Sequence, residues 1–186
     1  MGFGYKQGWL AVRDGEPDKI LGVIGGHAVG TMGWRAGLDR AYTNDDLVVV
    51  TPQLPGADGA PWTLVAGRYF LINEQWVDAA ELSRALGGEV QFFATYRVRE
   101  LHRWARAVDG VTVRALRYVG ETGEVTEWRG EPDQTELQIG LPPTYDPEHD
   151  VLVSEDDVMR LAAAWSVDPT SLDGRPAAGP LTAARL

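Results

Sequence analysis

The sequence predicts an α+β fold, with an antiparallel β-sheet of about six strands and about three covering helices. Strand-like runs outnumber helix-like runs, and they cluster in one block with tight turns between them. The two-residue connection Asp109-Gly110 is the strongest short-range signal of a β-hairpin, and the loop at 120–123 predicts a second hairpin. Such grouping favours a sheet covered by helices over a regular βαβ alternation.

Periodicity and turn residues place the elements. The expected strands cover residues 7–13, 47–51, 62–72, 90–95, 104–108 and 111–119, with a return strand from 125. The first expected helix starts at Pro17 and stops before Gly25-Gly26, and the second covers 78–86. The third is capped by Ser154 with Asp157 three residues later. Residues 27–43 are ambiguous, although a four-residue apolar spacing allows a short helix.

The 186 residues indicate one domain. We expect it to span 1–168, followed by a flexible tail rich in Ala, Gly and Pro over 169–186.

The composition and motifs of the sequence exclude several types of catalytic and metal site. The absence of cysteine excludes disulfides, thiolate metal sites and cysteine nucleophiles. There is no Lys-Ser/Thr phosphate loop after the glycines of 22–30, and no serine lies in a nucleophile elbow. His27, His102 and His149 belong to no short ligand motif, so we expect neither a metal nor a cofactor. No run is apolar enough to span a membrane, so the expectation is a soluble cytoplasmic protein.

Charge is unevenly distributed along the chain. The net charge of −10 argues against nucleic acid as a partner. Residues 97–117 carry a net charge of +4, whereas 118–159 carry −11. The two segments either neutralise each other on the surface, or the arginines converge on an anionic ligand.

The Asp109-Gly110 turn predicts a register for its hairpin. A type I′ turn pairs Val108 with Val111, and the same register sets Trp104 opposite Ala115 and His102 opposite Arg117. In the next hairpin Trp128 then lies beside Ala115, which leaves a slot between two indole rings. The path of residues 96–101 stays open.

This register predicts a candidate active site on one sheet face. Histidine transfers protons at neutral pH, and an arginine stabilises an oxyanion. The candidate catalytic residues are therefore His102, Arg117 and Glu100. The candidate substrate-binding residues are Trp104, Trp128, Arg106, Thr126 and Tyr96. The alternative is an ordinary polar trio at a solvated sheet edge.

Several short motifs resemble a set of small, uncharacterised proteins common in actinobacteria. They include 62–68 (WTLVAGR), 104–110 (WARAVDG), 113–118 (VRALRY) and 165–169 (WSVDP), and the resemblance covers about 47–170. It implies no established activity and no catalytic residues. An occurrence of such proteins beside toxin loci or natural-product clusters would suggest roles there.

Two functions follow from these observations. The first is a cofactor-independent acid/base enzyme on a small organic substrate, for example a natural-product lyase, isomerase or cyclase. Its chemistry would be dehydration or ring closure by conjugate addition, with His102 moving the proton. The second is a non-catalytic acidic binding protein, such as an immunity or accessory protein, that docks a basic partner.

Overall fold

A computed structural model describes residues 3–148, 150–172 and 178–186. Its centre is a ten-stranded sheet with the order β2-β10-β3-β5-β1-β6-β7-β8-β9, and β4 pairs with β5 alone. Neighbouring strands pair antiparallel throughout. The strands are β1 (Gly8–Arg13), β2 (His27–Met32), β3 (Leu47–Val50), β4 (Leu54–Pro55), β5 (Pro61–Gly67), β6 (Glu89–Tyr96), β7 (Leu101–Val108), β8 (Val111–Val119), β9 (Glu124–Arg129) and β10 (Leu181–Arg185).

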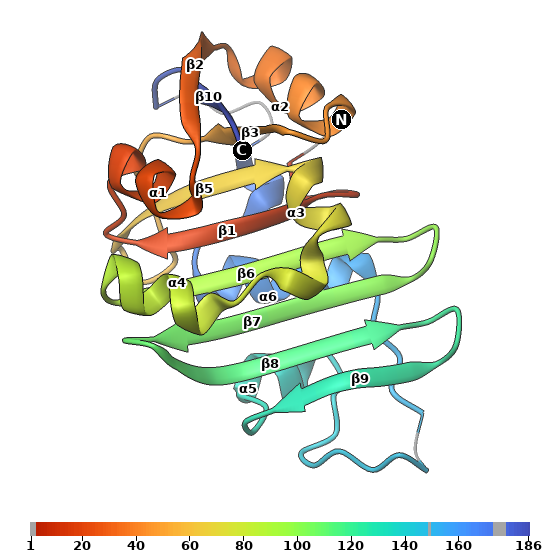
Figure 1. Cartoon of the computed structure of the whole chain (residues 1–186). Coiled ribbons are helices and arrows are strands. Elements are labelled where there is room, and N and C mark those ends of the chain that lie inside the picture. Colours follow the sequence, from red (N-terminus) through yellow and green to blue (C-terminus); the bar gives the residue numbers. More distant parts are fainter. Residues whose placement is uncertain (1–2, 149, 173–177) are drawn as a thin grey trace.

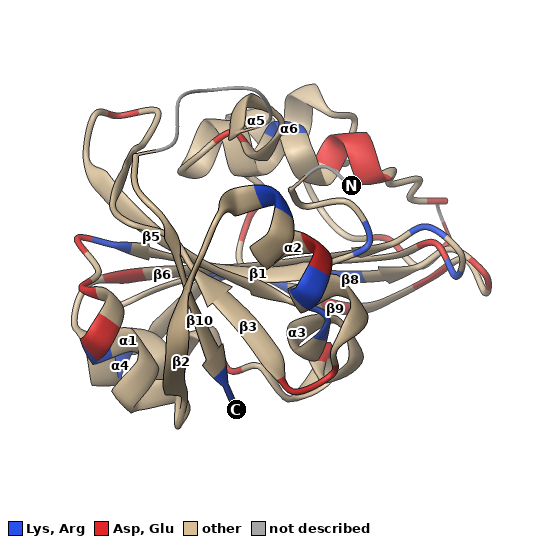
Figure 2. Ribbon diagram, turned by 90° about the horizontal axis from the view of Figure 1, so that it is seen from above, with Lys and Arg blue, Asp and Glu red and all other residues tan. Residues whose placement is uncertain are grey.

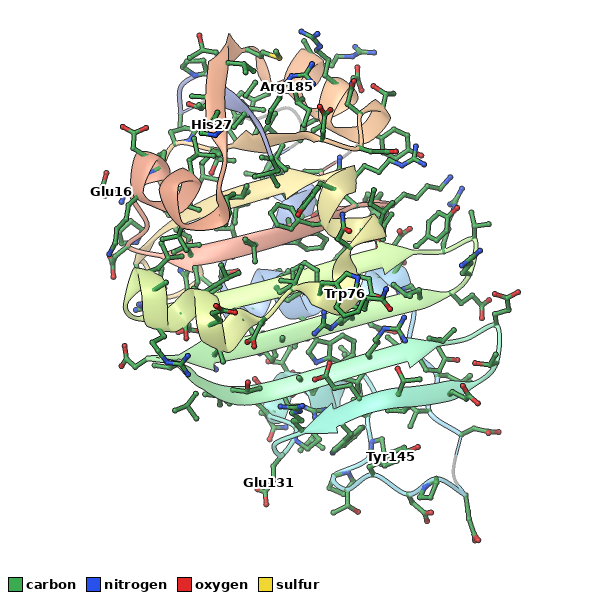
Figure 3. The ribbon with its side chains drawn as sticks, in the orientation of Figure 1. Glu16, His27, Trp76, Glu131, Tyr145 and Arg185 are labelled. Carbon is green, nitrogen blue, oxygen red and sulfur yellow. The ribbon has the colours of Figure 1, made fainter. Side chains whose placement is uncertain are left out.

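Helices cover both faces of the sheet (Figure 1). We call the face that carries α1 (Pro17–Ile24), α3 (Arg68–Ile72) and α4 (Ala79–Leu86) the front face. The 3₁₀ turn η1 (Glu74–Trp76) follows α3 on this face, where Trp76 is labelled in Figure 3. The back face packs against α2 (Trp34–Thr43) and α6 (Glu155–Trp165), with α5 (Gln134–Gln138) beside α6. A second 3₁₀ turn, η2 (Pro169–Leu172), follows α6.

The core therefore has two layers of side chains, one on each side of the sheet. Successive residues of a strand point to opposite faces, so Trp9 and Phe93 pack on the back while Leu10 and Phe92 pack on the front. Trp9 and Phe93 stack with ring centroids 5.1 Å apart. Because both faces are covered, the central strands are buried along nearly their whole length.

The predicted class is correct in kind, but the predicted size is wrong. Ten strands and six α-helices are found in the described residues, rather than about six and three. The short strands β2, β4 and β10 were missed because their pairing depends on distant partners and not on local propensity. The run 62–72 is also two elements, because β5 ends at Gly67 and α3 begins at Arg68.

The predicted C-terminal tail is largely wrong as well. Leu181, Ala183 and Ala184 are fully buried, and β10 lies between β2 and β3 inside the sheet. An Ala-rich composition suggested fraying, but small side chains fit a strand that is covered on both faces. Residues 173–177 of the predicted tail lie outside the described residues.

Candidate functional site

A cavity of about 500 Å³ opens at the end of the sheet where β6 stops and β7 begins. It is lined by side chains from five parts of the chain: the turn before β1, α2, the α3–η1 segment, the β6–β7 turn and β8. These residues are Lys6, Tyr42, Arg68, Leu71, Ile72, Glu74, Gln75, Tyr96, Arg99, Leu101 and Arg117. We call this cavity the front pocket.

The start of β1 allows α3 to approach closely enough to form one wall. A Cβ on Gly8 would lie 2.7 Å from the carbonyl carbon of Phe70 and 2.8 Å from the amide nitrogen of Leu71. Only glycine lets the two backbones meet in this way. Leu71 and Ile72 are thereby brought to the cavity next to the chain that enters β1.

The front pocket is cationic although the protein is acidic. Four cationic side chains and one carboxylate line it, in a chain with a net charge of −10. Arg68 pairs with Asp45 at 3.1 Å, and Arg117 pairs with Glu74 at 2.7 Å. Within the described residues, the Lys6 ammonium and the Arg99 guanidinium have no ion-pair partner, so these two charges are available to a ligand.

Lys6 is held in an uncommon backbone conformation. Its φ is 51°, in the left-handed region that costs a non-glycine residue about 1 kcal/mol. Its backbone N–H donates to Oε1 of Glu155 at 3.1 Å, and Thr95 donates to the same oxygen at 2.7 Å. These bonds fix the turn, so the position of Lys6 beside the sheet end is set by the fold.

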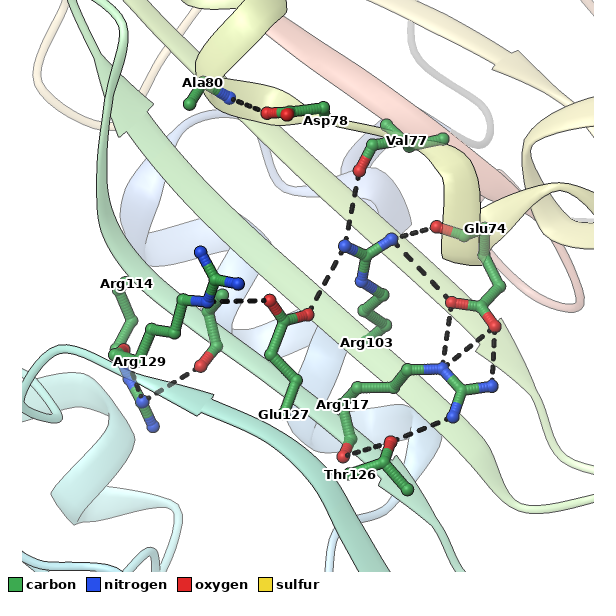
Figure 4. Close-up of polar contacts among 11 residues, drawn as sticks. Glu74, Val77, Asp78, Ala80, Arg103, Arg114, Arg117, Thr126, Glu127 and Arg129 are labelled. Atoms are coloured by element: carbon green, nitrogen blue, oxygen red, sulfur yellow. Dashed lines mark hydrogen bonds and ion pairs between the residues drawn. The ribbon is translucent and has the colours of Figure 1, made fainter.

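The inner wall of the front pocket is a network of charged groups (Figure 4). Arg117 donates to both carboxylate oxygens of Glu74, at 3.0 and 3.1 Å from Nε. Arg103 donates to the backbone oxygen of Glu74 and pairs with Glu127 at 3.4 Å. Glu74 is therefore neutralised by two arginines, and it ties η1 to strands β7 and β8.

The predicted meeting of His102 and Arg117 is wrong. The Asp109-Gly110 turn has the expected positive φ values of 48° and 84°. However, a bulge shifts the register between Arg106 and Ala107, so His102 pairs with Tyr118 and Arg103 pairs with Arg117. One extra residue turns all following side chains to the other face. His102 consequently lies on the back face and Arg117 on the front.

His102 is buried, with 2% of its surface exposed, and its ring stacks on that of Tyr118. Burial lowers the pKa of His102, while the carboxylates of Glu155, Glu100 and Asp157 oppose that shift. Glu155 and Asp157 belong to the acidic first turn of α6, shown in red in Figure 2. A buried neutral imidazole without access to the front pocket cannot serve a ligand there.

This burial predicts acid sensitivity of the fold. The unfolded chain takes up a proton on His102 near its ordinary pKa of about 6.5, but the folded chain does so only at lower pH. The free energy of unfolding should therefore fall as the pH drops from about 7 to about 5, by at most about 1.4 kcal/mol per pH unit from this group. Urea titrations of wild type and His102→Leu across this range measure the difference. An equal pH slope in both proteins would contradict the prediction.

The predicted slot between two indole rings is also absent. Trp104 and Trp128 do share the back face, but the residue between them is Leu116 and not Ala115. Trp104 is fully buried and donates from Nε1 to Glu136 at 2.8 Å. Trp128 stacks on Tyr145 and lies 4.3 Å from the Arg114 guanidinium. These tryptophans therefore pack against protein groups.

Of the remaining predicted site residues, some lie at the front pocket and others lie away from it. Tyr96 and Arg117 both line the front pocket, and Arg117 donates to Thr126 at 2.9 Å. Arg106 pairs with Glu89 at 2.6 Å, away from the pocket. Glu100 occupies the β6–β7 turn with a φ of 48°, and its backbone oxygen accepts from Gly120.

Sequence reasoning missed Lys6, Tyr42, Arg68 and Arg99, which come from segments far apart in the chain. The strand sequence carried no clear signal of the bulge. Val111 and Val113 are apolar but 64% and 46% exposed, so they do not mark a buried face before the bulge.

No cluster of three or more His, Asp or Glu side chains suited to a metal ion occurs in the part of the chain that the structure describes. Among the same residues, no helix is long and apolar enough to cross a membrane. Searches of family models, curated proteins and solved structures find no match to this chain. Functional inference therefore depends on the front pocket itself.

Proposed function

We propose that the protein binds a small organic anion in the front pocket. The observation that carries this proposal is a pair of cations, Lys6 and Arg99, that have no ion-pair partner among the described residues and line a cavity of about 500 Å³. That volume falls within the range of small-molecule sites. Arginine and lysine bind oxyanions through charge-assisted hydrogen bonds, and the tyrosine hydroxyls of Tyr42 and Tyr96 supply further donors.

The proposal keeps the small organic ligand expected from the sequence, but it does not use His102. None of the side chains that line the front pocket is a histidine. Its single carboxylate, Glu74, is already held by Arg117 and Arg103. The pocket residues therefore favour binding of an anion over general-base catalysis.

Acetate and phosphate titrations at constant ionic strength test this function, with binding followed by amide shifts in two-dimensional NMR. We expect saturable shifts around Lys6 and Arg99 in wild type. The affinity for the anion should fall about 10-fold or more in Lys6→Gln and in Arg99→Gln, because each variant loses a charge-assisted hydrogen bond to the anion. Arg160→Gln is the matched control, since Arg160 is 69% exposed on α6. Shifts that persist unchanged in both pocket variants, or no saturable shifts in wild type, would refute the function.

The alternative of a basic protein partner is a separate proposal for the acidic segment 118–159. Part of that segment serves the fold, because Glu136 pairs with Arg114 and Asp133 accepts from Trp165. Asp133→Lys would therefore disturb packing as well as any interface. Glu124→Lys is the cleaner test, since Glu124 is exposed and, among the described residues, its side chain has a hydrogen bond only with the neighbouring Thr122.

A further inference from the structure

The front pocket carries both charged and apolar side chains. Two of its cations, Lys6 and Arg99, come from the chain entering β1 and from the β6–β7 turn. Thr95 donates its backbone N–H to Gln7 at 3.0 Å, which places Lys6 level with Tyr96 on the neighbouring strand. Arg99 donates its backbone N–H back to Tyr96 at 3.1 Å, so the turn folds over at this point. Lys6 and Arg99 thus flank the same residue.

Apolar side chains also line the front pocket. Leu71 and Ile72 come from α3, and Leu101 comes from the first position of β7. Ile72 is 48% exposed, so its surface is open to a ligand. The rings of Tyr42 and Tyr96 add flat surface to the cavity wall. A ligand that fills this cavity meets both charged groups and hydrocarbon.

The fixed charges also limit the charge of the ligand. Arg68 and Arg117 are engaged by Asp45 and Glu74, which leaves two cations. The Glu74 carboxylate in the same cavity is already paired with Arg117 and Arg103, so the charge that remains for a ligand is that of Lys6 and Arg99. A single carboxylate matches the two free cations and accepts from both of them.

From this arrangement we infer that the ligand is a monocarboxylic acid with an aromatic or branched aliphatic body. The inference rests on the proposed function, because it assigns a chemical class to the anion of the same pocket. The carboxylate binds between Lys6 and Arg99. The body of the ligand covers Leu71, Ile72 and Leu101 and removes their exposed surface from water.

Three probes separate the charge of the ligand from its ring: acetate carries the charge without the ring, phenylacetamide carries the ring without the charge, and phenylacetate carries both. In calorimetric or NMR titrations we expect phenylacetate to bind at least 10-fold more tightly than either of the others. Ile72→Ser should remove most of this gain, whereas Leu152→Ser, a control at an 81% exposed apolar side chain that is not among the pocket residues, should leave the binding of all three probes as in wild type. Ile72 is half exposed, so the variant should fold, and thermal unfolding of the free protein verifies this.

The outcomes test this inference separately from the proposed function, which is anion binding. If acetate and phosphate bind through Lys6 and Arg99 but phenylacetate binds no more tightly than acetate, the anion site is supported. The inference of a ligand with an apolar body is then wrong. Phosphate that binds more tightly than phenylacetate would also overturn it. No saturable binding of any anion would refute the proposed function as well.

Discussion

Replacement of Glu136 by alanine should destabilise the protein by about 3–5 kcal/mol, because it leaves a buried charge without a partner. Glu136 is fully buried, and one of its oxygens accepts from both Arg114 and Trp104 at 2.8 Å. Its other oxygen accepts from the N–H of Asp133 and completes the capping box of α5. The Arg114 side chain is 3% exposed, so water cannot compensate for the lost carboxylate.

A graded series distinguishes the charge from the hydrogen bonds. Glu136→Gln keeps an acceptor for Trp104 but removes the charge that neutralises Arg114, so its stability should fall between those of wild type and Glu136→Ala. Urea unfolding followed by tryptophan fluorescence measures all three. Glu131→Ala is the control, since Glu131 is exposed in the loop that precedes α5. A loss below about 1 kcal/mol in Glu136→Ala, typical of an exposed ion pair, would show that this network does not hold β8 to α5.

Replacement of Glu74 by glutamine should have two opposite effects. The free energy of unfolding should fall by about 1.5–3 kcal/mol, because Arg117 and Arg103 lose a charged acceptor that is largely buried. Anion binding in the front pocket should become about 10-fold tighter, because the only carboxylate among its lining residues is gone and Arg117 is released.

Thermal unfolding and acetate titration of the same Glu74→Gln preparation measure both quantities. Glu81→Gln on α4 provides the control, because Glu81 is exposed outside the network. Weaker acetate binding in Glu74→Gln would mean that Glu74 organises the anion site instead of opposing it. Unchanged stability would mean that the Arg117 and Arg103 contacts do not anchor η1.

The α+β class, the Asp109-Gly110 hairpin and the three predicted helices could be derived from the sequence alone. Each depends on signals within about ten residues: a turn that requires positive φ, a capping side chain, or an apolar stripe of helical period. The start of α6 at Ser154 and the stop of α1 at Gly25 are confirmed for this reason. Local chemistry determines such features before any distant contact forms.

The candidate site required the tertiary structure. Arg117 was predicted to be catalytic and Tyr96 to bind substrate. Both line the front pocket, but they meet Lys6, Arg68 and Arg99 there instead of His102. The side of the sheet on which a residue lies depends on every residue between it and the turn, so the one bulge in β8 reversed the assignment. The sequence by itself determined the Asp109-Gly110 hairpin, the central strands and the three predicted helices, because their turn, cap and periodicity signals are local. Which side chains share a cavity was decided only when ten strands paired, because register and long-range packing depend on the whole sheet.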